Sequence, residues 1–289
     1  MGVVRDAVLV AAGLGTRMFP VSAFLPKETL PLVDVPWLTH LVLEAKAAGI
    51  ERFHVVVSPS KSFDGLLEDH RSMHALRSHL DEQLFNAADG MEVLTHIQVE
   101  PKGVANAIQA ALDDINGPFL VMLGDNLLMD AHSPTTDYAA TNASKKLVEA
   151  YHRSKTPTVA LMEVDEADVH HYGIVKLENH LITDMVEKPT PEQAPSRLAM
   201  CGRYVFPSDT KERLLHLPFE EHGDMQSIAL QHQWMQEGML HGMVLHDTRW
   251  YDSGSPMKWL QAQVDHALRR PDLREEMTAW LNHRLKDQR

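Results

Sequence analysis

The chain has 289 residues, 44% of them hydrophobic and 23% charged, which is typical of a soluble globular protein and suits one large α/β domain or two small ones. Its formal net charge of −13 disfavours non-specific binding to nucleic acids or anionic membranes, which requires a basic surface. The single cysteine, Cys201, excludes an internal disulfide. With no signal-peptide pattern and no apolar run of about 18 residues, we expect a cytoplasmic protein.

The first half of the chain alternates short apolar runs with helical patterns. We expect strands at residues 7–10, 52–57, 92–98 and 119–123, and helices at 37–48, 63–84 and 104–112. This alternation predicts an α/β fold with a mainly parallel sheet and helices on both of its faces. Ligands of such folds bind beyond the carboxyl ends of the strands, where Gly13, Gln98 and Asp125 are expected to converge.

The second half is less regular. We expect strands at residues 158–164 and 199–206, a β pair of 173–175 with 182–187, and helices at 225–237, 255–269 and 274–285, the last amphipathic. Without a low-complexity linker or an internal repeat, residues 1–289 are expected to form one unit. Its nucleotide-binding part would cover about residues 1–130, and its sugar-binding and helical part about 131–289.

A glycine-rich turn with two cations follows the first predicted strand. Gly13 and Gly15 lack a Cβ that would block a phosphate, and successive backbone N–H groups can bind an anion. Arg17 lies in the same turn and Lys27 follows ten residues later, which together suggest a triphosphate site. An ordinary tight turn is the alternative, since Met18 breaks the dinucleotide-binding pattern and no P-loop sequence follows.

Two aspartates follow apolar runs in distant segments. Asp125 ends a predicted strand, and Asp252 follows a β-like run shortly before Gly254. Carboxylates at strand ends can share one Mg²⁺ ion, whose other ligands are phosphate oxygens and water. Each also has a structural alternative, a turn for Asp125 and a helix N-cap for Asp252.

Three further polar side chains lie at predicted strand ends. Gln98 can read the edge of a base with its amide, although it could also be a surface amide. Glu187 can accept hydrogen bonds from sugar hydroxyls and Lys188 can hold a phosphate, with an exposed ion pair as the alternative. The eighteen histidines are scattered, so we expect most of them to face solvent and not to form a metal cluster.

These motifs, in this order, resemble the sugar-1-phosphate nucleotidylyltransferases, and more narrowly their bacterial UTP–glucose-1-phosphate uridylyltransferase branch. The resemblance implies a Rossmann-like three-layer fold, with a mainly parallel mixed central sheet and a smaller β-containing extension on the sugar side. It also implies that UTP and glucose 1-phosphate are converted to UDP-glucose and pyrophosphate with Mg²⁺, in a homodimer or homotetramer. The matching segments are Gly13-Leu14-Gly15-Thr16-Arg17, Pro26-Lys27-Glu28, Gln98 with Gly103, and residues 171–175, 186–189, 202–205 and 252–254.

The resemblance also implies residue roles. Arg17 and Lys27 would be catalytic and hold the triphosphate, and Asp125 and Asp252 would hold the metal. The residues implied to bind the nucleotide are Ala12, Gly13, Gly15, Thr16, Glu28, Gln98 and Gly103. Those implied to bind the sugar phosphate are Asp125, Gly173, Glu187 and Lys188.

Three segments depart from the family pattern. Asp34-Val35-Pro36 lacks the usual lysine, Gly124-Asp125-Asn126 has the thymidylyltransferase form, and residues 223–229 lack an acidic residue at each end of the usual motif. These departures leave two alternatives open. One is a thymidylyltransferase or a uridylyltransferase for another sugar phosphate, and the other is a weakly active regulatory paralogue that binds nucleotide.

Overall fold

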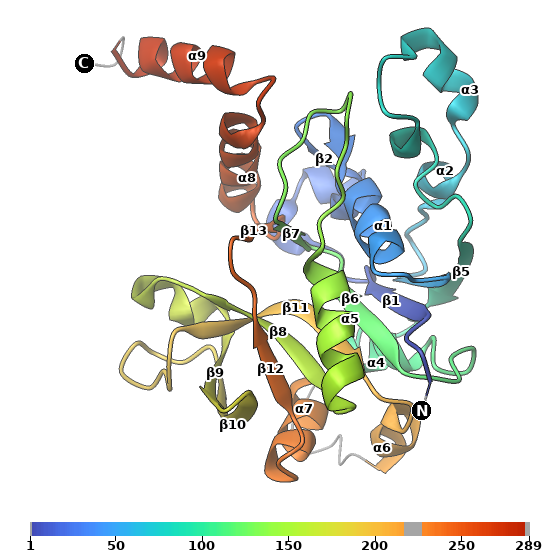
Figure 1. Cartoon of the computed structure of the whole chain (residues 1–289), viewed down its shortest axis with the longest axis vertical. Coiled ribbons are helices and arrows are strands. Elements are labelled where there is room, and N and C mark those ends of the chain that lie inside the picture. Colours follow the sequence, from blue (N-terminus) through green and yellow to red (C-terminus); the bar gives the residue numbers. More distant parts are fainter. Residues whose placement is uncertain (1, 217–226, 287–289) are drawn as a thin grey trace.

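A computed structural model describes residues 2–216 and 227–286 (Figure 1). A nine-stranded sheet forms its centre. In spatial order the strands are β5 (Glu92–Ile97), β4 (Arg52–Val57), β1 (Asp6–Val10), β6 (Phe119–Leu123), β11 (Leu198–Phe206), β8 (Thr158–Glu163), β12 (His241–Val244), β10 (Leu181–Glu187) and β9 (Gly173–Glu178). Two short two-stranded sheets lie outside it, the hairpin of β2 (Pro31–Leu32) with β3 (Val35–Pro36) and the pair of β7 (Asn126–Met129) with the distant β13 (Arg249–Asp252).

The sheet is mixed, with a parallel block formed by the first half of the chain. Strands β5, β4, β1 and β6 are all parallel, so their carboxyl ends meet at one edge. Strand β11 then runs antiparallel to both β6 and β8, and β9 and β10 form an antiparallel pair. The predicted α/β class with a mixed central sheet is therefore confirmed, and one sheet connects both halves of the chain.

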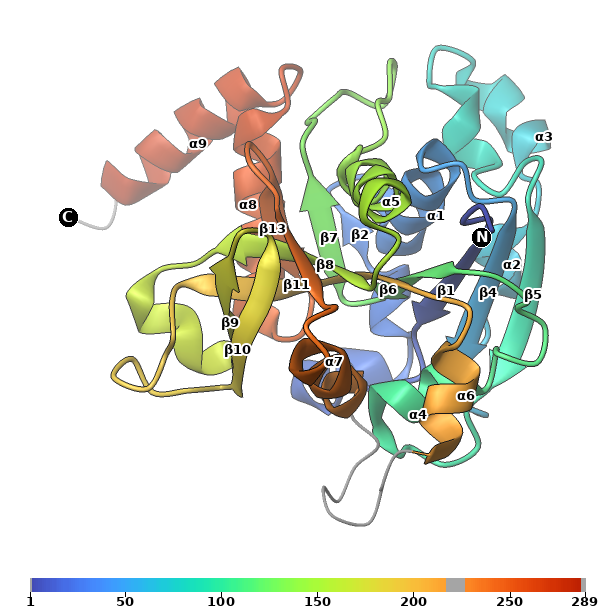
Figure 2. The same cartoon turned by 60° about the horizontal axis from the view of Figure 1, so that its bottom comes forward.

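Helices cover both faces of the sheet (Figure 2). Helices α1 (Trp37–Ala47) and α5 (Ala143–Ser154) pack together on one face, and α4 (Gly103–Gln109), α6 (Thr210–His216) and α7 (Ser227–Gln236) pack on the other. Helices α8 (Pro256–Arg269) and α9 (Arg274–Lys286) follow β13 and extend away from the sheet (Figure 1). Among residues 2–216 and 227–286, no helix combines the length and apolar character that a membrane crossing needs.

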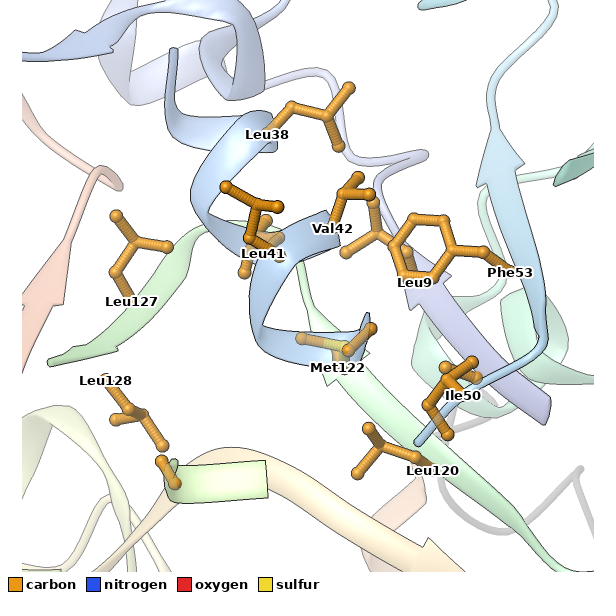
Figure 3. Close-up of a cluster of buried hydrophobic side chains, with 14 of the residues drawn as sticks. Leu9, Leu38, Leu41, Val42, Ile50, Phe53, Leu120, Met122, Leu127 and Leu128 are labelled. Atoms are coloured by element: carbon orange, nitrogen blue, oxygen red, sulfur yellow. The ribbon is translucent and has the colours of Figure 1, made fainter. Parts of the chain in front are cut away.

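The core on the α1 face shows why the first half folds as predicted. Leu38, Leu41 and Val42 lie at helical spacing on α1 and belong to the same buried cluster as Leu9 and Phe53 of the parallel strands (Figure 3). All five side chains are at most 1% exposed. Burying one such side chain contributes about 1.5–3 kcal/mol, so this interface fixes α1 against the strands that carry the loops beyond their carboxyl ends.

The predicted helix over residues 63–84 is wrong. The structure instead has the short helices α2 (Asp64–Leu67) and α3 (Arg71–His74), followed by 3-10 turns. Glu68 is already extended, and the carboxylates of Asp69 and Asp81 accept hydrogen bonds from the backbone N–H of the residues two positions later, at 2.9 and 3.1 Å. Such local bonds compete with helical ones, and each starts a new short turn, so the segment is divided into short pieces.

Three histidines are exceptions to the prediction that most of them face solvent. His40, His54 and His266 are at most 3% exposed. The His40 Nδ1 lies 2.6 Å from the Tyr138 hydroxyl, and the His266 Nδ1 lies 3.0 Å from His132 Nδ1. Burial, together with neighbouring cationic groups such as Arg270, lowers the pKa of both His40 and His266 to about 3.

These buried rings make stability depend on pH. The folded chain keeps His40 and His266 neutral, whereas the unfolded chain protonates them near pH 6.5, so their contribution is complete above that pH and is lost as the pH falls toward about 3. We expect the free energy of unfolding to fall by about 1–3 kcal/mol between pH 6.5 and 5.5. Denaturant titrations at both pH values measure this loss. His266→Asn, which cannot titrate, should flatten the slope, and an unchanged slope would contradict the assignment.

Candidate active site

Contacts of Gly15 with Ser22 and Lys27 hold the glycine-rich loop after β1 in place. Gly15 adopts φ +66°, a left-handed conformation that glycine tolerates, and its carbonyl accepts a hydrogen bond from Ser22 Oγ at 2.7 Å. A Cβ on Gly15 would lie 3.3 Å from Lys27 Cδ, so the lysine stem packs directly on this residue. The loop thereby brings the two predicted cationic segments together.

Lys27 contacts Asp125, the predicted metal ligand that follows strand β6. Its Nζ lies 2.7 Å from Asp125 Oδ2, and the Lys27 and Asp125 side chains are 10% and 29% exposed. Because β1 and β6 are adjacent and parallel, the loops after them meet at the same edge of the sheet. Burial alone would raise the pKa of the Asp125 carboxyl, but Lys27 and then Arg17 lower it below its usual range. The carboxylate is therefore ionised at neutral pH.

Strand β13 brings the second aspartate to Asp125. It pairs antiparallel with β7, so Asp252 lies opposite Asn126, and Ser253 N donates to the Asp125 carbonyl at 2.9 Å. Figure 1 shows β7 and β13 side by side. The arrangement joins segments more than 120 residues apart, and the pairing of these strands is what brings the backbone around Asp252 beside Asp125.

Arg17 lies beside Asp252, over Gly254. A Cβ on Gly254 would stand 2.8 Å from Arg17 Nη2 and 2.7 Å from Asp252 Oδ1, distances that real Cβ atoms do not show. The absence of a side chain at Gly254 is therefore what allows the guanidinium to approach. Asp252 is not a helix N-cap, because Ser255 caps α8 by accepting from Lys258 N.

A lysine that the sequence reading did not single out connects Asp252 to the sugar-side segment. Lys258 Nζ donates to Asp252 Oδ2 at 2.9 Å and to the Tyr172 hydroxyl at 3.2 Å. Tyr172 directly precedes Gly173, which pairs with Glu187 in the β9–β10 hairpin. Glu187 and Gly173 are thus brought together, and a Cβ on Gly173 would lie 2.9 Å from Glu187 Oε2.

The remaining predicted residues lie around this cluster. Lys188 follows Glu187 with its side chain 63% exposed, and its Nζ lies 3.7 Å from the Glu187 carboxylate. Ala12 is buried, whereas Gly13 and Thr16 lie exposed in the loop. Gln98 follows β5, two strands away from β1 at the same edge of the sheet.

Gln98 is held by the N-terminal end of α4. Its Nε2 donates to the Gly103 carbonyl at 3.0 Å and to Asn106 Oδ1 at 2.8 Å. The predicted pair of Gln98 and Gly103 is therefore in direct contact, and Asn106 is an additional partner. The sequence could have indicated Asn106, because its amide lies three residues after Gly103, about one helical turn further along α4.

Glu28 is almost fully buried and binds a lysine that the sequence reading missed. Lys61 Nζ lies 3.0 Å from Glu28 Oε2 and also donates to the carbonyls of Ala11 and Gly13, at 2.9 and 2.6 Å. Burial raises the pKa of Glu28, and Lys61 opposes this. Lys61 thus fixes the backbone of the glycine-rich loop from the loop that follows the neighbouring strand β4. Only its position after a strand end could have drawn attention to it.

The two aspartates fit a hard divalent cation. Each carboxylate is held in place by two hydrogen bonds. Asp125 accepts from Lys27 and from Asn126, and Asp252 accepts from Gly254 N and from Lys258. Within the described residues, no cluster of three or more histidine, cysteine or acidic side chains offers an alternative metal site. Two carboxylates leave the remaining coordination positions for phosphate oxygens and water, as Mg²⁺ prefers.

Known proteins of similar sequence and structure share nearly the whole chain. Residues 6–268 match the family described as Nucleotidyl transferase. The chain is 32% identical to UTP–glucose-1-phosphate uridylyltransferase YngB of Bacillus subtilis, with 98% of this chain and 96% of the relative covered. It is also 32% identical to the UTP–glucose-1-phosphate uridylyltransferase of Streptococcus pneumoniae, with 96% and 95% covered.

Solved structures agree with this assignment. A UTP-bound UGPase from Acinetobacter baumannii superimposes with a TM-score of 0.82 at 25% identity, covering 96% of this chain and 98% of that one. A UDP-glucose pyrophosphorylase complexed with UDP-glucose gives a TM-score of 0.77 at 30% identity, with 91% and 98% covered. The family match, the near full-length relatives and the fold agree, and the chain belongs to the nucleotidyl transferase family.

Proposed function

We propose that this chain transfers the uridylyl group of UTP to glucose 1-phosphate, giving UDP-glucose and pyrophosphate. The observation that carries the proposal is the convergence of two cations and two carboxylates, Arg17, Lys27, Asp125 and Asp252, at the edge of the sheet beside the glycine-rich loop. The uridylyltransferase names of the near full-length relatives support the choice of substrates.

The reaction is an in-line displacement at the α-phosphorus. A phosphate oxygen of glucose 1-phosphate attacks, a new P–O bond forms, and the bond to the β-phosphate breaks with release of pyrophosphate. No protein nucleophile is required, because catalysis of this kind rests on positioning and on charge stabilisation. Arg17 and Lys27 would neutralise the charge that develops on the triphosphate.

The other residues would position the two substrates. Asp125 and Asp252 would hold a Mg²⁺ ion, which supplies further charge neutralisation at phosphate oxygens. Glu187, beside Gly173, would accept hydrogen bonds from sugar hydroxyls, and the exposed Lys188 would hold the sugar phosphate. The nucleotide would occupy the first part of the chain, about residues 1–130, and the sugar phosphate the part that follows.

A substrate panel tests the proposal. Pyrophosphate release would be measured for UTP and dTTP, each with glucose 1-phosphate, its epimers and N-acetylglucosamine 1-phosphate. We expect the highest kcat/KM for UTP with glucose 1-phosphate. A preference for dTTP would assign the chain to the thymidylyltransferases instead. Nucleotide binding without turnover of any pair would identify a regulatory paralogue.

Gly254→Ala provides a test of the Arg17 position. The added methyl would displace the guanidinium or the Asp252 carboxylate, and a shift of about 1 Å can cost about 100-fold in rate. We expect kcat to fall by about 10- to 100-fold while the melting temperature stays within a few degrees. Gly65→Ala is the matched control, because a Cβ there meets no atom within 4 Å. Equal rates for the two variants would refute the role of Gly254.

We further propose that the protein acts in the cytoplasm and assembles as a homodimer or homotetramer. The lone, buried Cys201 supports a reducing compartment. Helix α9 has no buried side chain, and Trp280 on it is 51% exposed, which supports a role in assembly. Sedimentation velocity of the full chain measures its mass in solution, and a monomer at micromolar concentration would contradict this assignment.

A further inference from the structure

The Gln98 side chain is held in one orientation by two acceptors. It is 9% exposed, and its backbone N–H donates to the Val57 carbonyl at 2.8 Å, which fixes the residue at the end of β5. Its Nε2 donates to the Gly103 carbonyl and to Asn106 Oδ1, at 3.0 and 2.8 Å. Both N–H groups of the amide are therefore engaged.

The direction of this amide follows from the chemistry of Gly103. A backbone carbonyl can only accept a hydrogen bond, so the group of Gln98 that faces it must be the NH2. Asn106 must then present its oxygen to the second N–H, as it does. Gln98 Oε1 accepts no hydrogen bond from the part of the chain that the structure describes, and it is the polar atom left to meet a ligand.

Open space lies beside this pair of amides. A cavity of about 360 Å³ is lined by Gln98, Asn106 and Gln109, together with the apolar side chains of Ile97 and Val99. Ile97 and Val99 are 55% and 76% exposed. The nearly buried Gln98 and the half-buried Asn106 therefore border a cavity of mixed polar and apolar character.

We propose that Asn106 is a positioning residue: as the second acceptor beside the Gly103 carbonyl, it restrains the Gln98 amide so that its carbonyl stays directed at the base and selects a ring with an N–H donor on its edge. The proposal rests on the proposed function, because it assumes that Gln98 meets the base of the nucleotide. Uracil and thymine carry an N–H at N3, whereas cytosine has an acceptor there. Reading cytosine would require the Gln98 amide to turn over, which would place its oxygen against the Gly103 carbonyl and would require the Asn106 amide to turn as well.

Asn106→Leu removes the acceptor and frees one N–H of Gln98. We expect the KM and the dissociation constant for UTP to rise about 10-fold, while kcat stays within about 2-fold. The ratio of UTP to CTP affinity should fall by at least about 10-fold, since the loosened amide can then meet N3 of cytosine. Isothermal titration with each nucleotide measures the ratio directly.

Two matched variants separate positioning from other effects. Asn106→Asp keeps an acceptor toward Gln98, so it should retain the wild-type UTP-to-CTP ratio even where its charge weakens both affinities. Gln109→Leu removes an amide from the same cavity without touching Gln98, and it should also keep the ratio. If Asn106→Leu does not fold, Asn106→Ala replaces it, with the melting temperature as the check.

The outcomes distinguish this inference from the proposed function. A wild-type ratio in folded Asn106→Leu, or the same loss of selectivity in Asn106→Asp, would overturn the role of Asn106. A wild-type chain that binds UTP but releases no pyrophosphate would overturn the proposed reaction, while the binding ratios would still test Asn106.

Discussion

Arg17→Ala should lower kcat by about 100- to 1,000-fold, the effect of removing one preorganised group that stabilises developing charge. The guanidinium lies over Gly254 beside Asp252 and contributes to the low pKa of Asp125, so it faces the space where the triphosphate would bind. Arg17 is exposed, and within the described part of the chain it is not part of a buried hydrogen-bond network. Its removal should therefore leave the stability of the fold unchanged. Steady-state pyrophosphate release and a thermal melt measure the two quantities.

A control distinguishes this effect from a general loss of positive charge. Arg71→Ala removes another exposed arginine, which pairs with Asp69 at the start of the short helix α3. It should keep wild-type kcat. Arg17→Lys retains the charge but not the planar fork, and it should recover only part of the rate. Full activity in Arg17→Ala would remove the main catalytic assignment of this chain.

Arg203→Met should lower the free energy of unfolding by about 3–5 kcal/mol, because it leaves a buried carboxylate without its partner. Arg203 and Glu44 are both fully buried and form two hydrogen bonds, at 2.9 and 2.8 Å. Ser144 Oγ donates to the same carboxylate, so α1, α5 and β11 all meet at this group. Denaturant titration at pH 7.5 measures the loss.

Arg203 also supports the candidate active site. Arg203 Nη2 donates to the Asn126 carbonyl at 2.9 Å, which fixes the start of β7 next to Asp125. A double variant, Arg203→Met with Glu44→Leu, should regain most of the lost stability, because an apolar pair of similar volume is often as stable as a buried ion pair. A loss below about 1 kcal/mol in the single variant would show that the carboxylate finds another partner or a proton.

The loops that carry the site follow directly from the sequence, because their positions depend on local pattern. Apolar runs and helical spacing place β1, β4, β6 and α1 correctly, and strand ends of a parallel block must share one edge. The helix prediction for residues 63–84 fails because side-chain carboxylates there accept hydrogen bonds from nearby backbone N–H groups. The spacing of apolar residues does not reveal such bonds.

Part of the family pattern lies outside the residues that the structure describes. The start of the predicted helix 225–237, and most of the departing segment 223–229, lie outside the described residues. The described helix α7 begins at Ser227. Val35 stands where the family pattern has a lysine. It is 3% exposed and pairs with Leu32 in the β2–β3 hairpin, so its side chain contributes to packing.

The sequence by itself determined the chemistry available to this protein: a glycine-rich turn with Arg17 and Lys27, and carboxylates at Asp125 and Asp252. Only the tertiary structure decided which of these groups meet. The pairing of β13 with β7 brings Asp252 to Asp125, Gly254 leaves room for Arg17, and distant residues such as Lys61 and Asn106 orient the groups that would contact the nucleotide. Contacts of this kind depend on the packing of whole elements, which no local pattern in the chain encodes.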